Sequence, residues 1–189
     1  MAQSALLVMD VQNGIVNSLL GDNRDAYLET VSSVIDTARQ ANLPVIFVVV
    51  RFRQGFPEVS PDNLSFSKLK DRGTDFQETA AAAQPALTPK PEEVIVTKRR
   101  VSAFSGSDLE VVLRAQRIDH LILTGIATSG VVLSTLREAA DKDYRLTVIA
   151  DACYDADNSV HDVLTTKIFP KQANVLTAVD WIKAVKKQG

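Results

Sequence analysis

Cysteine and histidine are scarce in this sequence, and their scarcity excludes several kinds of site. The 189 residues include a single cysteine, Cys153, so no internal disulfide can form. This fits a reducing compartment, and we expect a cytoplasmic location. Only two histidines are present, His120 and His161, and they lie far apart in the sequence. A histidine-based metal centre is therefore not indicated.

Long apolar runs and an excess of charge of one sign are absent as well. No stretch approaches the roughly 20 apolar residues of a membrane span, and residues 1–4 lack the basic start of a secretion signal. The 21 basic and 23 acidic residues give a net charge of -2. Without a basic face, nucleic acid is not an expected partner. We expect neither a nucleic-acid nor a membrane partner.

What the sequence has in plenty is short, continuous apolar segments. These runs fall at residues 5–9, 45–50, 94–96, 120–123, 146–149 and 174–176. Runs that do not alternate with polar residues are typical of strands buried on both faces, as in a parallel sheet. Stripes with helical spacing lie between them. We therefore predict a three-layer α/β/α sandwich, a doubly wound, mostly parallel sheet of about six strands, in one domain over residues 1–189.

One segment, residues 52–87, interrupts this alternation with glycine, proline and many polar residues. A long connection inside a compact domain is usually functional or mobile. The run of alanines at 80–83 within it is compatible with a short helix or with a loop.

Polar groups follow three of the predicted strands. Asp10 ends the first run, Lys98 follows the third, and residues 124–131 follow the fourth. Ligands of parallel α/β sheets bind beyond the carboxyl ends of the strands, so all three should meet at one edge. Each also has an ordinary explanation: a turn cap, a solvated lysine and a helix start. On position alone these alternatives stay open.

Together the three segments resemble a known family. "LLVMDVQNGI" at 6–15, "KRRVSAFSGSDLEVVLR" at 98–114 and "LTGIATSGVVLSTLREAADKDY" at 123–144 are similar to motifs of the isochorismatase-like hydrolases, in the cysteine hydrolase superfamily. The resemblance implies catalytic roles for Asp10 and Lys98. It places the nucleophilic cysteine of the amidase members at Val131, and a valine side chain can neither attack a carbonyl nor lose a proton.

The resemblance has further implications for the site. Nicotinamidase-like members carry an Asp-x-His pair after the second strand, where this chain has Arg51 and Arg53, so we expect no metal and no cofactor. A cis peptide bond is implied between Ile126 and Ala127. The backbone amides of Ala127 and Val131 would then form an oxyanion or anion site. A homo-oligomer, a dimer or larger, is also expected.

Isochorismatases of this family also lack the cysteine, and they cleave a vinyl ether with the aspartate as general acid. We therefore expect hydrolysis of a small, anionic molecule without a thiol intermediate, with isochorismate as the named candidate. The candidates for substrate binding are Arg51, Arg53, Phe104 and Ser129. Isochorismatases often have a tyrosine where this chain has Ala127, which is a departure. Two alternatives remain: an amide hydrolase that uses Ser129 or water, and a catalytically silent member that binds a metabolite or partner.

Overall fold

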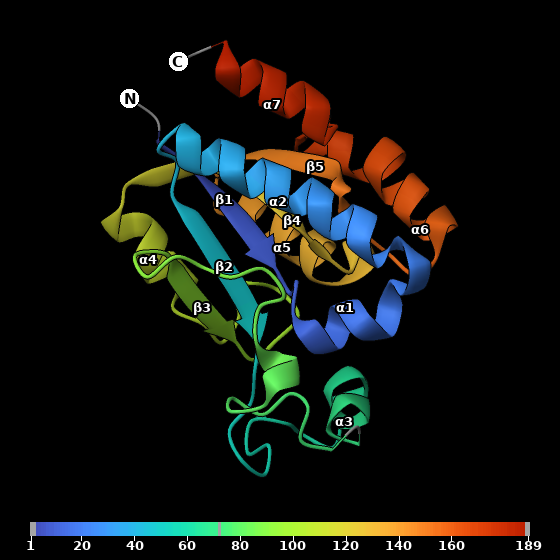
Figure 1. Cartoon of the computed structure of the whole chain (residues 1–189). Coiled ribbons are helices and arrows are strands. Elements are labelled where there is room, and N and C mark those ends of the chain that lie inside the picture. The colour runs from blue at the N-terminus through green and yellow to red at the C-terminus, as the bar shows by residue number, and fades with distance from the viewer. Residues whose placement is uncertain (1–2, 72, 188–189) are drawn as a thin grey trace.

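The computed structural model describes residues 3–71 and 73–187 and contains a six-stranded sheet in the order β3-β2-β1-β4-β5-β6 (Figure 1). All paired strands run parallel. The strands are β1 (Gln3–Met9), β2 (Val45–Val50), β3 (Val94–Lys98), β4 (Ile118–Ile126), β5 (Arg145–Tyr154) and β6 (Asn174–Leu176). The predicted doubly wound parallel sheet is confirmed.

Helices cover both faces of this sheet, which explains why the strand runs are apolar without alternation. The helices are α1 (Asn13–Leu19), α2 (Arg24–Gln40), α3 (Leu64–Lys70), α4 (Leu109–Ala115), α5 (Leu133–Asp141), α6 (Asn158–Val163) and α7 (Ala178–Lys186). Short helical turns are η1 (Gly21–Asn23), η2 (Ala81–Ala83), η3 (Thr128–Val132), η4 (Leu164–Ile168) and η5 (Phe169–Lys171). Among residues 3–71 and 73–187, no helix combines the length and the apolar character needed to cross a membrane.

Two cores result from these layers. Leu7 and Met9 of β1 point to a core shared with α4 and α5, whereas Leu6 and Val8 point to a core shared with α2 and α7. In Figure 1, α2 lies in front of the sheet and α5 behind it. Burial of alternate β1 side chains on opposite faces holds the strand rigidly at the centre of the sheet. Whatever follows its carboxyl end is therefore fixed in position.

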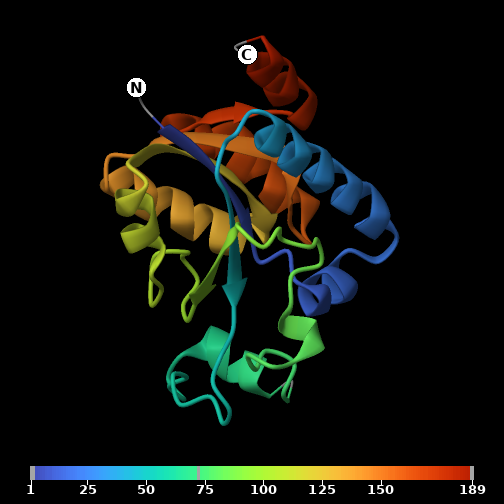
Figure 2. The same ribbon diagram turned by 60° about the vertical axis from the view of Figure 1, so that its left-hand side comes forward.

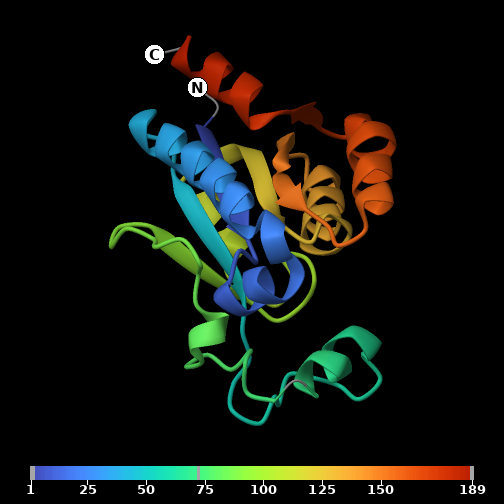
Figure 3. The ribbon, with the colours of Figure 1, turned by 45° about the vertical axis from the view of Figure 1, so that its right-hand side comes forward.

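The segment between β2 and β3 forms a small lobe, which we call the 52–87 lobe. It projects beyond the carboxyl end of β2 in all three ribbon views (Figures 1, 2 and 3). The lobe has its own apolar cluster, in which the Phe52 ring lies 5.5 Å from both the Phe56 and the Phe66 ring centroids. The alanine run contributes the short turn η2. The lobe thus stands over the sheet edge where ligands of such folds bind.

Glycine is required at position 125, where β4 passes β1. Gly125 pairs with Met9 and has a φ of +151°. A Cβ atom built there would lie 2.3 Å from the carbonyl oxygen of Met9, closer than van der Waals contact allows. This close approach brings the loop after β4 next to the end of β1.

Candidate active site

The structure brings Asp10 and Lys98 together at the carboxyl edge of the sheet. Lys98 is the last residue of β3 and Asp10 follows β1, so the two side chains meet across the end of β2. Lys98 Nζ lies 2.9 Å from Asp10 Oδ2, and the side chains are 2% and 8% exposed. Asp10 has a φ of 57°, in the left-handed region that aspartate tolerates better than most residues. Its backbone N–H donates to the carbonyl of Val48 at 2.8 Å.

The two oxygens of the Asp10 carboxyl group have different surroundings. Oδ2 is held by Lys98, whereas Oδ1 is buried and has no hydrogen-bond partner within the part of the chain that the structure describes. Burial raises the pKa of Asp10, and the attraction of Lys98, which acts in the opposite direction, only partly offsets it. Lys98 Nζ also donates to the carbonyl of Arg100 at 2.9 Å. The site therefore presents a buried carboxyl group with a raised pKa and one oxygen that has no hydrogen-bond partner in the described chain.

Gln12 is a site residue that the sequence analysis did not single out. Its side chain is fully buried, and Oε1 accepts the N–H of Val50 at 2.8 Å. Its Nε2 donates to the carbonyls of Val50 at 3.1 Å and Ala83 at 2.8 Å. Gln12 therefore ties the end of β2 and the 52–87 lobe to the turn that carries Asp10. In the sequence, Gln12 is one of two adjacent polar residues after Asp10, which gives no signal that its side chain is buried.

The loop after β4 reaches the same edge. The peptide bond between Ile126 and Ala127 is cis, and Val131 lies in the short turn η3 with 2% of its surface exposed. The carbonyl of Ala127 accepts the N–H groups of Gly130 at 3.1 Å and Val132 at 3.3 Å. Backbone bonds therefore fix the turn that carries Val131, and the turn leads directly into α5.

Two polar contacts, one from the residue that follows β5 and one from α6, also hold this turn, and neither was predicted from the sequence. The carboxylate of Asp155 accepts the backbone N–H of Ser129 at 2.7 Å. The hydroxyl of Thr128 lies 2.9 Å from Nδ1 of His161. The Ser129 amide is therefore already engaged, while its side chain is exposed.

Comparison with known proteins identifies the chain. The model of the isochorismatase domain matches residues 4–180. This protein belongs to the isochorismatase family. An isochorismatase family protein of Bacillus subtilis is 30% identical over 97% of this chain and 95% of its own. A ureidoacrylate amidohydrolase of Stutzerimonas stutzeri is 29% identical over 97% of this chain and 80% of its own. A solved isochorismatase family structure from Burkholderia thailandensis is 32% identical, with a TM-score of 0.81, over 97% of this chain and 96% of that one.

Family membership makes this protein a hydrolase, as the amidohydrolase names of its relatives support. The single cysteine of the chain is a poor nucleophile. Cys153 is buried in the core that the sheet shares with α4 and α5, and burial raises the pKa of its thiol to about 12. A thiol with such a pKa is almost entirely protonated near neutral pH. Nor does any group of three His, Cys, Asp or Glu side chains suited to a metal ion occur within residues 3–71 and 73–187.

The structure places three of the predicted substrate-binding side chains in existing contacts. Arg51 donates from Nε to the carbonyl of Ala83 at 3.0 Å and from Nη2 to Gln84 at 2.8 Å. Arg53 is 65% exposed and pairs with Glu58 at 2.6 Å. Phe104 is buried in the core with Val131, and its ring centroid lies 5.9 Å from that of Tyr144. Each of the three thus has a structural contact with other residues of the protein.

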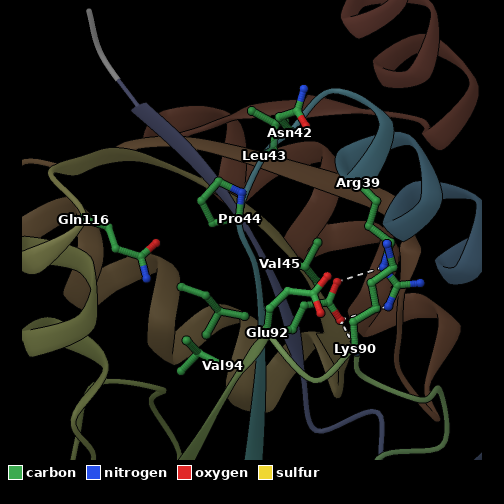
Figure 4. A pocket seen from close by; sticks show the side chains of 11 residues that line it. Arg39, Asn42, Leu43, Pro44, Val45, Lys90, Glu92, Val94 and Gln116 are labelled. Carbon is green, nitrogen blue, oxygen red and sulfur yellow. Dashed lines mark hydrogen bonds and ion pairs between the residues drawn. The ribbon is translucent and has the colours of Figure 1, made fainter.

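A cavity of about 420 Å³ lies elsewhere, at the amino ends of β2 and β3 (Figure 4). Arg39 and Lys90 line it together with Glu92. The guanidinium of Arg39, labelled in Figure 4, forms an ion pair with Glu93 at 2.8 Å. The cavity is at the opposite edge from Asp10 and Lys98, where parallel α/β sheets do not usually bind substrates. We assign it no part in the reaction.

Proposed function

We propose that this hydrolase cleaves a small anionic metabolite without a covalent thiol intermediate, by hydrolysis of a vinyl ether with Asp10 as the general acid. The observation that carries the proposal is the unequal pair of Asp10 oxygens. Oδ2 is bound to Lys98, while buried Oδ1 has no partner in the described chain. The raised pKa of Asp10 favours the protonated acid that such a reaction needs.

The reaction is a hydrolysis that consumes one water. In an enolpyruvyl ether such as isochorismate, Asp10 gives its proton to the terminal methylene carbon, and the double bond supplies the electron pair. The resulting oxocarbenium ion takes up the oxygen of water, and the proton that the water loses returns to Asp10. The hemiketal then breaks its carbon–oxygen bond to the ether oxygen, the electron pair of its hydroxyl forms the carbonyl of pyruvate, and the hydroxyl proton passes to the ether oxygen, which leaves as the alcohol.

Lys98 supports this proton transfer through charge. While Asp10 is protonated, the ammonium group of Lys98 has no anionic partner and can attract an anionic substrate. As the proton leaves, a carboxylate forms 2.9 Å from Nζ and is stabilised there. The lysine thus stabilises the charge that develops in the transition state.

The loop at 125–131 would supply the rest of the site. In this proposal the amides of Ala127 and Val131 bind a carboxylate or carbonyl oxygen of the substrate. Val131, at the position where the resemblance puts the nucleophilic cysteine, forms an apolar wall. No side chain there can form a covalent intermediate, so water is the nucleophile.

A second candidate is amide hydrolysis by water. The observation in its favour is the similarity to a ureidoacrylate amidohydrolase, which covers 97% of this chain. Ser129 is a weak candidate for a nucleophile, because among the contacts of the described residues its hydroxyl has no hydrogen bond to a general base.

The distinguishing experiment measures products. The purified protein is incubated with isochorismate and with ureidoacrylate and N-carbamoyl amino acids, and the release of pyruvate and of ammonia is followed. We expect pyruvate only, and the alcohol product should contain no ¹⁸O when the reaction runs in labelled water. Ammonia release without pyruvate would favour the amide candidate. Release of neither product would favour a silent, ligand-binding member.

A further inference from the structure

The junction between the end of β3 and the 52–87 lobe contains more cations than anions. Two carboxylates, Glu58 and Glu78, face Arg53 and Arg99 there. Glu58 pairs with Arg53 at 2.6 Å and with Arg99 at 3.3 Å, and Glu78 also pairs with Arg99. Both acids are therefore bound to these arginines. Any further arginine in the junction lacks a carboxylate partner.

Arg100 is that further arginine. Its Nη1 donates to the carbonyls of Arg99 at 2.6 Å and Glu58 at 3.2 Å, which are neutral acceptors. Among residues 3–71 and 73–187, Arg100 forms no ion pair, and its Nε and Nη2 donate to no acceptor. The side chain is nevertheless half-buried. A half-buried cation of this kind gains free energy when an anion reaches it.

Its position connects Arg100 with the proposed reaction. The carbonyl oxygen of Arg100 accepts the hydrogen bond from Lys98 Nζ at 2.9 Å, so its backbone adjoins the Asp10–Lys98 pair. Arg51 differs in a decisive respect, because its Nε and Nη2 are already bound to Ala83 and Gln84. The Nε–Nη2 edge of a guanidinium matches a carboxylate in a bidentate geometry. Arg100 keeps this edge free.

We propose that Arg100 is a specificity-determining residue that binds a carboxylate group of the substrate through Nε and Nη2. This inference rests on the proposed function, since it concerns the substrate of the same site. Oε2 of Glu58, in the same junction, is buried and lacks a partner within the described residues. A hydrogen-bond donor on the substrate would satisfy it. The substrate class is therefore a small carboxylate that also carries a hydroxyl or an N–H group.

Binding rather than turnover tests this assignment. The probes are 3-hydroxybenzoate and its neutral isostere 3-hydroxybenzamide, measured by isothermal titration calorimetry on the whole protein. The wild type should bind the carboxylate about tenfold more tightly or better, as a charge-assisted pair implies. Arg100→Gln should bind the two probes equally within about twofold, because it lacks the charge-assisted contact with the carboxylate. Arg145→Gln, which removes a 60% exposed arginine from the other edge of the sheet, should behave like the wild type.

Arg100→Lys separates charge from geometry and also serves if the glutamine variant does not fold. It should keep only part of the preference, because an ammonium group cannot form the bidentate pair. An unchanged preference in either variant, or no preference in the wild type, would overturn the proposal. If the preference for the carboxylate depends on Arg100 but the protein releases no pyruvate from isochorismate, the role of Arg100 in binding is supported and the vinyl-ether reaction is overturned.

Discussion

The Asp10–Lys98 pair makes a quantitative prediction about stability, because both partners are buried. We consider Lys98→Met, Asp10→Asn and the double variant. Above the raised pKa of Asp10, each single substitution removes one charge and leaves the other in the interior, with side-chain exposures of only 2% for Lys98 and 8% for Asp10. The double variant removes both charges and leaves side chains of similar size.

The expected magnitudes follow from this burial. Removing one partner of a buried pair costs about 3–5 kcal/mol, whereas replacing both partners is often nearly neutral. The double variant should therefore lose at least about 2 kcal/mol less than the sum of the two single losses. In Lys98→Met, Asp10 can escape the penalty by keeping its proton. Its native-state pKa is then raised further, so the loss should be small at low pH. It should grow as the pH rises from the native-state pKa of Asp10 in the wild type to the higher native-state pKa in the variant, because the protonation of the two native states differs only over this range.

Urea denaturation followed by circular dichroism, repeated between pH 4 and pH 8, measures these quantities. The slope of the free energy of unfolding against urea serves as a control, because a constant slope shows that the same surface is exposed in each variant. Strictly additive losses would contradict a direct interaction between the two groups. A loss in Lys98→Met that stays constant with pH would show that Lys98 does not lower the pKa of Asp10.

Two further substitutions test other parts of the site. Val131→Cys should place a thiol near Lys98, and the ammonium group should lower the pKa of that thiol. Iodoacetamide should therefore label position 131 faster than Cys153, whose pKa is about 12, as located by peptide mass spectrometry. Slower labelling of position 131 in the folded variant would show that Lys98 does not activate this position. Gly125→Ala should prevent stable folding or lower the melting temperature strongly, because its Cβ would lie 2.3 Å from the Met9 carbonyl oxygen. Gly21→Ala, with a φ of 49° and no atom within 4 Å of its Cβ, should cost only about 1 kcal/mol, and equal losses in these two variants would argue against the close approach of β1 and β4.

The sheet was predictable because its strands are buried on both faces. The apolar runs at 45–50 and 174–176 coincide with β2 and β6. The runs at 120–123 and 146–149 underestimate β4 and β5, which extend to Ile126 and Tyr154. Their final residues include polar and small side chains that pair after a shift in register, and hydrophobicity alone gives no signal for such pairing.

The meeting of Asp10 and Lys98 was also predictable, since parallel strands end at one edge. The contacts of Gln12 and Arg100 were not, because both depend on the path of the 52–87 lobe. That path is set by the packing of Phe52, Phe56 and Phe66, which have no regular spacing in the sequence. The bond from Asp155 to the Ser129 amide likewise joins segments whose proximity arises only from the register of β4 and β5.

The most direct test of Asp10 as the general acid is the pH dependence of kcat/KM for pyruvate release from isochorismate. In the wild type the rate should fall on the alkaline side as Asp10 loses its proton, at a pKa above the ordinary value for an aspartate. Asp10→Asn should be slower by about 10²-fold or more, since general acid catalysis contributes that much, and should lack the alkaline fall. An Asp10→Asn variant that keeps the wild-type rate, or the same alkaline fall, would contradict the role of Asp10.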